Sequence, residues 1–193
     1  METNNKSARD EGDILLVDDD ASIRESVGGL LAACGFRVLV ADSYESAIKI
    51  LKTTEKEIET VLCDIKMPGK SGLDVLRYVG ENDLGVPVIL LTGVASLESC
   101  RIAVKDGALE YLLKPIDNKD DLIYSLRRGV NKYRSDKQHC QAQADLMAMA
   151  EQHCDILDKL LSDLETKDVV LKNLNKIMEK WKKLLPKLTE DQL

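Results

Sequence analysis

Polar side chains that could act together in chemistry follow four apolar runs of this sequence. The stretch VLCDIKMPGKSG, residues 61–72, places Asp64 directly after an apolar run and before a turn-forming Met-Pro-Gly. A carboxylate in apolar surroundings is unfavourable unless another group balances its charge, so Asp64 should have partners. The candidate partners follow the apolar runs of ILLVDDD, VILLTG and YLLKP; they are Asp18, Asp19, Asp20, Thr92 and Lys114.

These residue types suit the transfer of a phosphoryl group. Carboxylates that lie close together repel one another unless a hard cation shares them, and Mg²⁺ prefers oxygen ligands of this kind. A cation, a hydroxyl donor and a lysine can together neutralise the charge of a phosphoryl group during its transfer. Asp64 would then be the nucleophile and would form an acyl phosphate.

The candidate residues can meet if the apolar runs are strands of one parallel sheet. Five short apolar runs alternate with segments that carry apolar residues three and four positions apart, which is typical of helices. The expected strands are 14–17, 36–40, 60–63, 86–91 and 109–113, and the expected helices are 21–34, 43–53, 72–80, 96–105 and 118 onward. This alternation predicts a doubly wound α/β fold with a five-stranded parallel sheet. Ligands of such sheets gather at the carboxyl ends of the strands, where all the candidate residues lie.

Over about residues 12–130 the sequence resembles the receiver domain of two-component response regulators. The resemblance is carried by ILLVDDD, DIKMPGKSG, LLTG and YLLKP, with 45, 28 and 22 positions separating Asp19, Asp64, Thr92 and Lys114 in turn. Each motif alone is weak, but four in this order at the ends of the expected strands are specific. The resemblance implies a flavodoxin-like sheet with strand order 2-1-3-4-5.

The resemblance also implies roles in phosphoryl transfer. Asp64 corresponds to the phosphoacceptor, while Thr92 and Lys114 would each bind a phosphoryl oxygen. Tyr111 matches the aromatic switch residue that moves inward when the threonine moves. The Lys114–Pro115 peptide bond is expected to be cis, as is typical of the family.

A second set of implied roles concerns the metal. Asp19 resembles a direct Mg²⁺ ligand, and Asp18 matches the neighbouring acidic position, a ligand through water or directly. Asp64 completes the acidic set, and Lys66 would contribute its backbone carbonyl. Mn²⁺ is a possible substitute for Mg²⁺. Asp20 is expected to lie outside the site, as a helix cap.

Residues 131–193 are expected to form a separate helical segment. No glycine occurs from 130 to 193, and the one proline there, Pro186, should end or kink a helix. Apolar residues recur there at alternating steps of three and four, with Lys167 at the one polar position, which is typical of a heptad seam. The seam residues are Leu157, Leu160, Leu164, Leu171, Leu174, Met178, Trp181, Leu185 and Leu188, and Ile156, Val170, Ile177 and Leu184 form a second row beside them.

Two arrangements of this helical segment remain open at this stage. One is a coiled coil that forms a homodimer through residues 146–188, because a single helix offers no counterpart for its own apolar seam. The other is a helical hairpin that turns near residue 165, where Ser162 or Thr166 could cap a new helix. His139 and His153, each followed by cysteine, are interpreted as coincidental or as seam positions.

The composition narrows the classes of function. Residues 1–129 hold 16 basic and 23 acidic residues, whereas 130–193 hold 11 of each, so the whole net charge of −7 belongs to the first part. An acidic domain is a poor direct ligand of nucleic acid. No apolar run approaches the roughly 20 residues of a membrane span, and residues 1–11 are expected to be a disordered polar tail without a secretory signal. Five cysteines without a Cys-x-x-Cys fit reduced, buried thiols in the cytoplasm.

These expectations combine into a cytoplasmic response regulator. It would accept a phosphoryl group from a histidine kinase or phosphotransfer protein, catalyse its own phosphorylation and dephosphorylation, and signal through its C-terminal helices by dimerisation or partner contact. An alternative is the N-terminal part of a larger enzyme, such as a hybrid histidine kinase, diguanylate cyclase or ATPase, beginning after Leu193. A phosphorylation-independent scaffold is a third possibility, against which the complete acidic site argues.

Overall fold

The computed structural model describes residues 11–94, 96–116, 118–163 and 168–190, with the backbone alone described at 162, 163, 168–170 and 184–190. The tail expected at residues 1–11 therefore lies almost wholly outside the described residues. The chain divides into two compact units, Met1–Asp136 and Lys137–Leu193.

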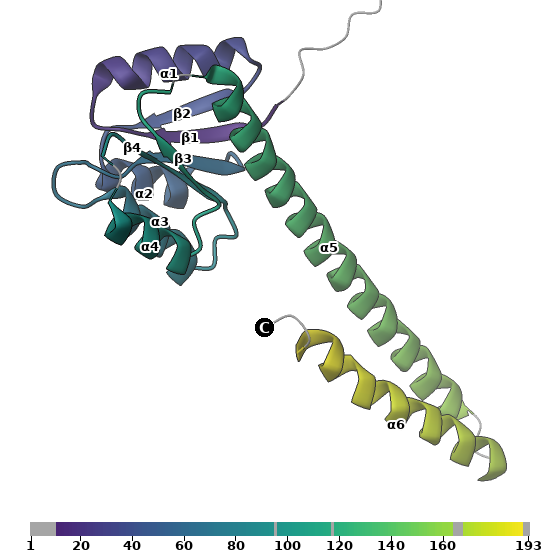
Figure 1. Cartoon of the computed structure of the whole chain (residues 1–193). Helices are drawn as coiled ribbons and strands as arrows, with labels where there is room; N and C mark the ends of the chain where they lie inside the picture. Colours follow the sequence, from purple (N-terminus) through teal and green to yellow (C-terminus); the bar gives the residue numbers. More distant parts are fainter. Residues whose placement is uncertain (1–10, 95, 117, 164–167, 191–193) are drawn as a thin grey trace, which may run out of the picture. The chain divides into compact units, whose positions relative to one another are not determined.

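The first unit is built on five parallel strands in the order β2-β1-β3-β4-β5 (Figure 1). Their bounds are Asp13–Val17 (β1), Arg37–Ala41 (β2), Thr60–Asp64 (β3), Val88–Thr92 (β4) and Glu110–Leu113 (β5). The predicted fold class and strand order are confirmed. The largest shift from the predicted bounds is at β4, which begins after Pro87 rather than at Val86. Pro87 has no N–H for the ladder, although its carbonyl accepts a hydrogen bond from the Val61 N–H at 2.9 Å.

Helices cover both faces of the sheet (Figure 1). These helices are α1 (Ala21–Ala33), α2 (Tyr44–Thr53), α3 (Gly72–Glu81), α4 (Leu97–Lys105) and the first part of α5 (Lys119–Asp163), whereas α6 (Asp168–Glu190) belongs to the second unit. Alternate strand residues point to opposite faces. Ile14 and Leu16 pack with α1 and α5, whereas Leu15 and Val17 pack with α2, α3 and α4. All four are fully buried, which explains why the strands read as nearly continuous apolar runs.

The first part of α5 approaches the sheet closely. A Cβ added at Gly129 would lie 2.6 Å from Thr60 Oγ1, so only glycine lets the helix backbone come this near β3. One turn further on, Arg134 Nη2 donates to Glu59 Oε2 at 3.0 Å, and the same buried carboxylate accepts the Asp13 N–H at 2.9 Å. The hydroxyl of neighbouring Tyr133 donates to Glu57 at 2.7 Å. Residues 129–134 of α5 are thereby fixed to the amino-terminal edge of the sheet.

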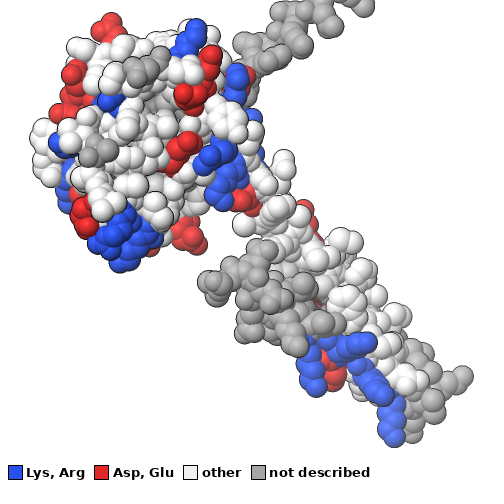
Figure 2. All heavy atoms as spheres, in the orientation of Figure 1, with Lys and Arg blue, Asp and Glu red and all other residues white. Residues whose placement is uncertain are grey.

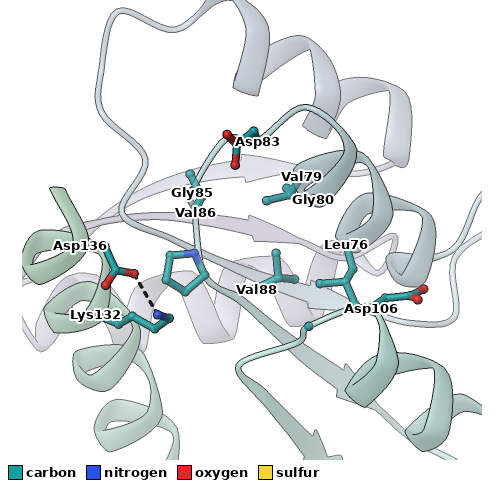
Figure 3. A pocket seen from close by; sticks show the side chains of 12 residues that line it. Leu76, Val79, Gly80, Asp83, Gly85, Val86, Val88, Asp106, Lys132 and Asp136 are labelled. Atoms are coloured by element: carbon teal, nitrogen blue, oxygen red, sulfur yellow. Dashed lines mark hydrogen bonds and ion pairs between the residues drawn. The ribbon is translucent and has the colours of Figure 1, made fainter. Parts of the chain in front are cut away.

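A cavity of about 280 Å³ also lies at this amino-terminal edge (Figure 3). Leu76, Val79 and Val88 form its apolar part, and the Lys132–Asp136 ion pair, 2.9 Å long, lies on its α5 side. Because Val88 begins β4, the cavity is at the opposite end of the strands from Asp64, which ends β3.

The second unit is a helical hairpin. A row of α5 residues at steps of three and four is half-buried, and it faces α6, where Leu171 and Leu174 are half-buried and Met178 is 7% exposed. The α5 row, called here the inner row, is Met147, Ala150, Cys154, Leu157 and Leu161. α5 ends at Asp163 and α6 begins at Asp168, and the turn considered near residue 165 lies outside the described residues.

The hairpin corrects one step of the sequence argument. The apolar seam was expected to lack a counterpart within its own segment, but α5 supplies one, so seam burial alone does not require a second chain. Pro186 does not end the helix, because α6 continues to Glu190. Lys167 and the side chains of Leu164, Val170, Leu184, Leu185 and Leu188 lie outside what the structure describes.

The five cysteines are free thiols, and they differ in burial. Only Cys63 is buried, and burial raises the pKa of its thiol; Cys100 and Cys140 are exposed, so the expectation of buried thiols is wrong for them. None of the helices that the structure describes is long and apolar enough to span a membrane.

The close approach at Gly129 predicts an unusual sign for a glycine-to-alanine substitution. Gly129→Ala should lower the free energy of unfolding by about 1–2 kcal/mol, because the new methyl group overpacks against Thr60. Gly29→Ala, in an exposed part of α1 with no atom within 4 Å of the added Cβ, should raise it by about 0.5–1 kcal/mol through helix propensity. Urea unfolding of the two variants gives both values. Equal stabilisation in both would contradict the tight helix–sheet contact.

Candidate functional site

The carboxyl ends of β1 and β3 bring two carboxylates to one ammonium group. Val17 pairs with Cys63 across the two strands, so Asp18 and Asp64 stand at the same level. Lys114 Nζ lies 2.6 Å from Asp18 Oδ2 and 2.6 Å from Asp64 Oδ1. Both aspartates are buried, at 1% and 5% exposure, while the lysine side chain retains 17%. The ammonium group is thus the balancing charge that a buried Asp64 requires.

Local hydrogen bonds hold Asp18 in place. Its Oδ1 accepts the Asp20 N–H at 2.9 Å, and its backbone carbonyl accepts Arg24 Nη1 at 2.6 Å. The Asp20 side chain turns away to cap α1, accepting the N–H groups of Ser22 at 2.8 Å and Ile23 at 3.4 Å. The expectation that Asp20 is a helix cap is confirmed.

Two backbone features position Lys114: its hydrogen bond to the end of β4 and the peptide bond between Lys114 and Pro115. Its backbone N–H donates to the Thr92 carbonyl at 2.7 Å, and the Lys114–Pro115 bond is cis. Thr92 is 1% exposed, and its hydroxyl donates to the Val94 carbonyl at 3.0 Å while accepting the Val94 N–H at 3.3 Å. In the sheet Asp64 stands beside Leu91, one residue before Thr92. The hydroxyl is therefore at the same edge as the acidic pair.

Tyr111 belongs to the α4 side of the sheet. It packs against the core beneath α2, α3 and α4, and its hydroxyl lies 2.9 Å from the hydroxyl of Ser99 in α4. Ser96 is the N-cap of the same helix; its hydroxyl accepts the Ser99 N–H at 3.0 Å, and its carbonyl accepts the Ser99 hydroxyl at 3.0 Å. A movement of Tyr111 would thus break a specific contact with the first turn of α4.

The remaining acidic and carbonyl donors lie at the rim. Asp19 and Lys66 are exposed, and the backbone of Lys66 hydrogen-bonds to the Asp64 carboxylate. Among the described residues, no three acidic, histidine or cysteine side chains already converge as a metal cluster. The donor set of Asp18, Asp19, Asp64 and a carbonyl consists of hard oxygens, and Mg²⁺ usually keeps several waters as further ligands. The residues present therefore fit Mg²⁺ chemically, once Lys114 yields part of its contact with the carboxylates.

Burial and pairing act in opposite directions on the charges of the site. Burial raises the pKa of Asp64, and the hydrogen bond from Lys114 only partly offsets this effect. Burial also acts to lower the pKa of Lys114, but its hydrogen bonds with Asp18 and Asp64 outweigh that effect, so the pKa is raised overall. The lysine is therefore held in its charged form, as charge balance at this edge requires.

Two residues beside the site were not recognised from the sequence. Gly72 begins α3, in agreement with the expected helix 72–80, but its packing was not anticipated: a Cβ at this position would overlap the Asp64 carbonyl oxygen. Arg24 supports the Asp18 backbone from within α1. The second glycine of DIKMPGKSG, Gly72, could have indicated a close approach of two backbone segments. Nothing in the spacing of the helix residues indicated the role of Arg24.

Fold and site together define a doubly wound α/β domain whose acidic edge is held by one lysine. A sequence model described as the response regulator receiver domain matches residues 14–127. The chain belongs to this family.

Several known proteins are similar to the chain over this region. The transcriptional regulatory protein ZraR of Escherichia coli (strain K12) is 36% identical over 121 residues, which are 63% of this chain and 27% of that protein. The DNA-binding transcriptional regulator NtrC of the same strain is 32% identical over 128 residues, or 66% of this chain and 26% of that one. The chain thus matches only about a quarter of the length of these relatives.

Solved structures give the same result for the fold. A response regulator receiver domain protein from Clostridium thermocellum has a TM-score of 0.60 and 34% identity, covering 64% of this chain and 97% of that one. The beryllofluoride-activated NtrC4 receiver domain dimer has a TM-score of 0.57 and 28% identity, covering 63% and 98%. An adenylate cyclase from Rhodopirellula baltica has a TM-score of 0.63 and 25% identity, covering 69% and 96%.

The shared ammonium group predicts how the site responds to loss of its lysine. Lys114→Met leaves two buried carboxylates without their cation, so the free energy of unfolding should fall by about 3 kcal/mol without divalent ions. Millimolar Mg²⁺ should restore much of that loss and should stabilise this variant more than the original chain, because the competing ammonium is gone. Lys66→Met, which removes an exposed side chain, is the control and should change little. An equal loss with and without Mg²⁺ would contradict this account of the charges.

Proposed function

We propose that this chain is a phosphorylation-dependent response regulator that accepts a phosphoryl group on Asp64. The observation that carries the proposal is the shared contact of Lys114 with Asp18 and Asp64 at the carboxyl edge of the sheet. The donor would be a histidine kinase or phosphotransfer protein, and the site would act in the cytoplasm. Family membership supports this reading, because the matched region contains every residue of the site.

In the proposed transfer, a carboxylate oxygen of Asp64 attacks phosphorus and the bond to the leaving group breaks. The product is an acyl phosphate, and the electron pair of the broken bond leaves with the donor. Lys114 exchanges its Asp64 contact for a phosphoryl oxygen, which keeps its charge paired throughout. Asp18, Asp19, Asp64 and the Lys66 carbonyl would hold Mg²⁺, or Mn²⁺ in its place. When bound, the cation supplies charge neutralisation for the phosphoryl oxygens.

The switch that follows would begin at Thr92. Its hydroxyl now bonds only the backbone of Val94 among its described contacts, and it could turn to a phosphoryl oxygen without breaking the strand. The space it leaves would draw Tyr111 inward, at the expense of the hydroxyl contact with Ser99. These two movements, of Thr92 and then of Tyr111, would connect the acyl phosphate to the first turn of α4.

The output is proposed to pass through the C-terminal helices, by dimerisation or by contact with a partner. The relatives are regulators of transcription by name, whereas a structural neighbour is named an adenylate cyclase. Similarity over the receiver domain therefore does not determine which kind of output the protein has. The alternative, a receiver and signalling helices that precede a larger enzyme, is supported by the length of the relatives. The mass of the full-length gene product separates the two possibilities.

The nucleophile assignment gives a direct prediction. Incubation with acetyl phosphate and Mg²⁺ should add one phosphoryl group per chain that is stable in acid and labile in base, and omission of the divalent ion should abolish the addition. Asp64→Asn should remove it, because an amide does not form the acyl phosphate. Intact mass and acid-gel labelling give the stoichiometry.

Asp20→Asn is the matched control for this experiment. It makes the same substitution at a neighbouring position of the same edge, and asparagine caps a helix about as well as aspartate. Labelling should persist in this variant. Undiminished labelling of Asp64→Asn would show that another residue is the phosphoacceptor.

A further inference from the structure

One side of the C-terminal hairpin presents large apolar side chains to solvent. Six residues on it, called here the outer face, have exposed fractions from 47% to 57%. They are Leu146, Met149, Ile156 and Leu160 of α5, with Ile177 and Trp181 of α6. Single exposed apolar residues are ordinary, but a set this large on one small element is typical of an interaction surface.

The six residues lie on the same side of the hairpin. On α5 they recur with His153 at steps of three and four, one position before the inner row, which places them about a quarter turn round the helix from it. A groove of about 270 Å³ is lined by α5 residues, among them His153 and Ile156, and by Trp181 of α6. The outer face is therefore continuous across α5 and α6.

The two helices of the hairpin carry opposite charge. From 137 to 161, α5 holds four acidic and two basic residues, whereas from 171 to 183 α6 holds five lysines and one glutamate. Figure 2 shows the blue side chains gathered along α6. A surface that joins one acidic and one basic helix is complementary in charge to a second copy of itself, provided that unlike helices meet.

We infer that the outer face binds the outer face of a second copy of this chain, giving a four-helix bundle in which each α5 lies between its own α6 and the partner's α6. The heptad spacing of the α5 residues fits this packing, and His153 takes the one polar position in the row. The inference deepens the dimerisation part of the proposed function, and its role in signalling rests on that function.

Charge also selects one of two symmetric ways to join the hairpins. A two-fold axis along the bundle places each α5 against the partner's α6, with both α5 helices running in the same direction. An axis across the bundle instead places α5 against α5 and α6 against α6. Packed helices lie about 8–10 Å apart, no more than about one Debye length at ordinary salt, so like helices would repel. The structure favours the axis along the bundle.

Trp181 makes the inference directly measurable, because it is the only tryptophan of the chain. Its fluorescence emission should shift to shorter wavelength as the concentration of the whole chain rises from roughly 0.1 to roughly 100 µM, which spans the affinities of ordinary interfaces. Sedimentation of the same samples should show a monomer–dimer equilibrium over the same range.

Paired variants test which face makes the contact. Met149→Glu with Ile156→Glu should weaken dimerisation at least tenfold, because it buries two charges in the contact. Ala144→Glu with Ala148→Glu adds the same charge to the same helix, at exposed positions away from the inner row and the outer face, and should leave the dimer intact. Circular dichroism establishes that each variant keeps its helices.

Carbodiimide cross-linking of mixed isotopically labelled and unlabelled chains tests the orientation. Links between a carboxylate of α5 in one copy and a lysine of α6 in the other are expected. A chain that stays monomeric throughout, or a dimer that leaves Trp181 emission unchanged, would overturn the inference, and absence of the inter-copy links would overturn the orientation. Phosphate uptake at Asp64 is measured separately, so a monomer that still takes up phosphate contradicts the bundle and leaves the phosphoacceptor in place.

Discussion

The contact of one lysine ammonium with two buried carboxylates is the constraint that organises the first unit. Asp18, Asp64 and Lys114 come from three strand ends, and their charges can be buried only if the strands stand in the observed register. Breaking one member of such a buried set typically costs several kcal/mol, so the site stabilises the fold that forms it. The same arrangement leaves an excess of negative charge at the rim, which suits a cation and an incoming phosphoryl group.

The opposite edge of the sheet determines where α5 is held. Gly129 lets the helix backbone reach β3, and Arg134 pairs with buried Glu59 one turn later. The helix then continues without a break to Asp163, into the unit that contains the hairpin. α5 is one helix from Lys119 to Asp163 and therefore contributes residues to both units.

The sequence was most informative where a residue type is tied to a backbone position. Continuous apolar runs ending in Asp18, Asp64, Thr92 and Lys114 predicted the parallel sheet and its acidic edge, since buried strands have few other readings. The sequence did not decide between a hairpin and a coiled coil, because a row of apolar residues at heptad spacing can be buried equally well against a helix of the same chain or of another chain. Arg24 was missed because its contact is with the Asp18 carbonyl, which no pattern of side chains records.

The central claim is that Asp64 alone becomes the acyl phosphate, and chemical trapping tests it most directly. Borohydride reduces an aspartyl phosphate to homoserine, and peptide mass spectrometry after treatment with acetyl phosphate and Mg²⁺ locates the altered residue. Conversion at position 64 and at no other aspartate is the predicted result. Conversion at Asp18 or Asp19, or none in chains that have taken up phosphate, would contradict the account.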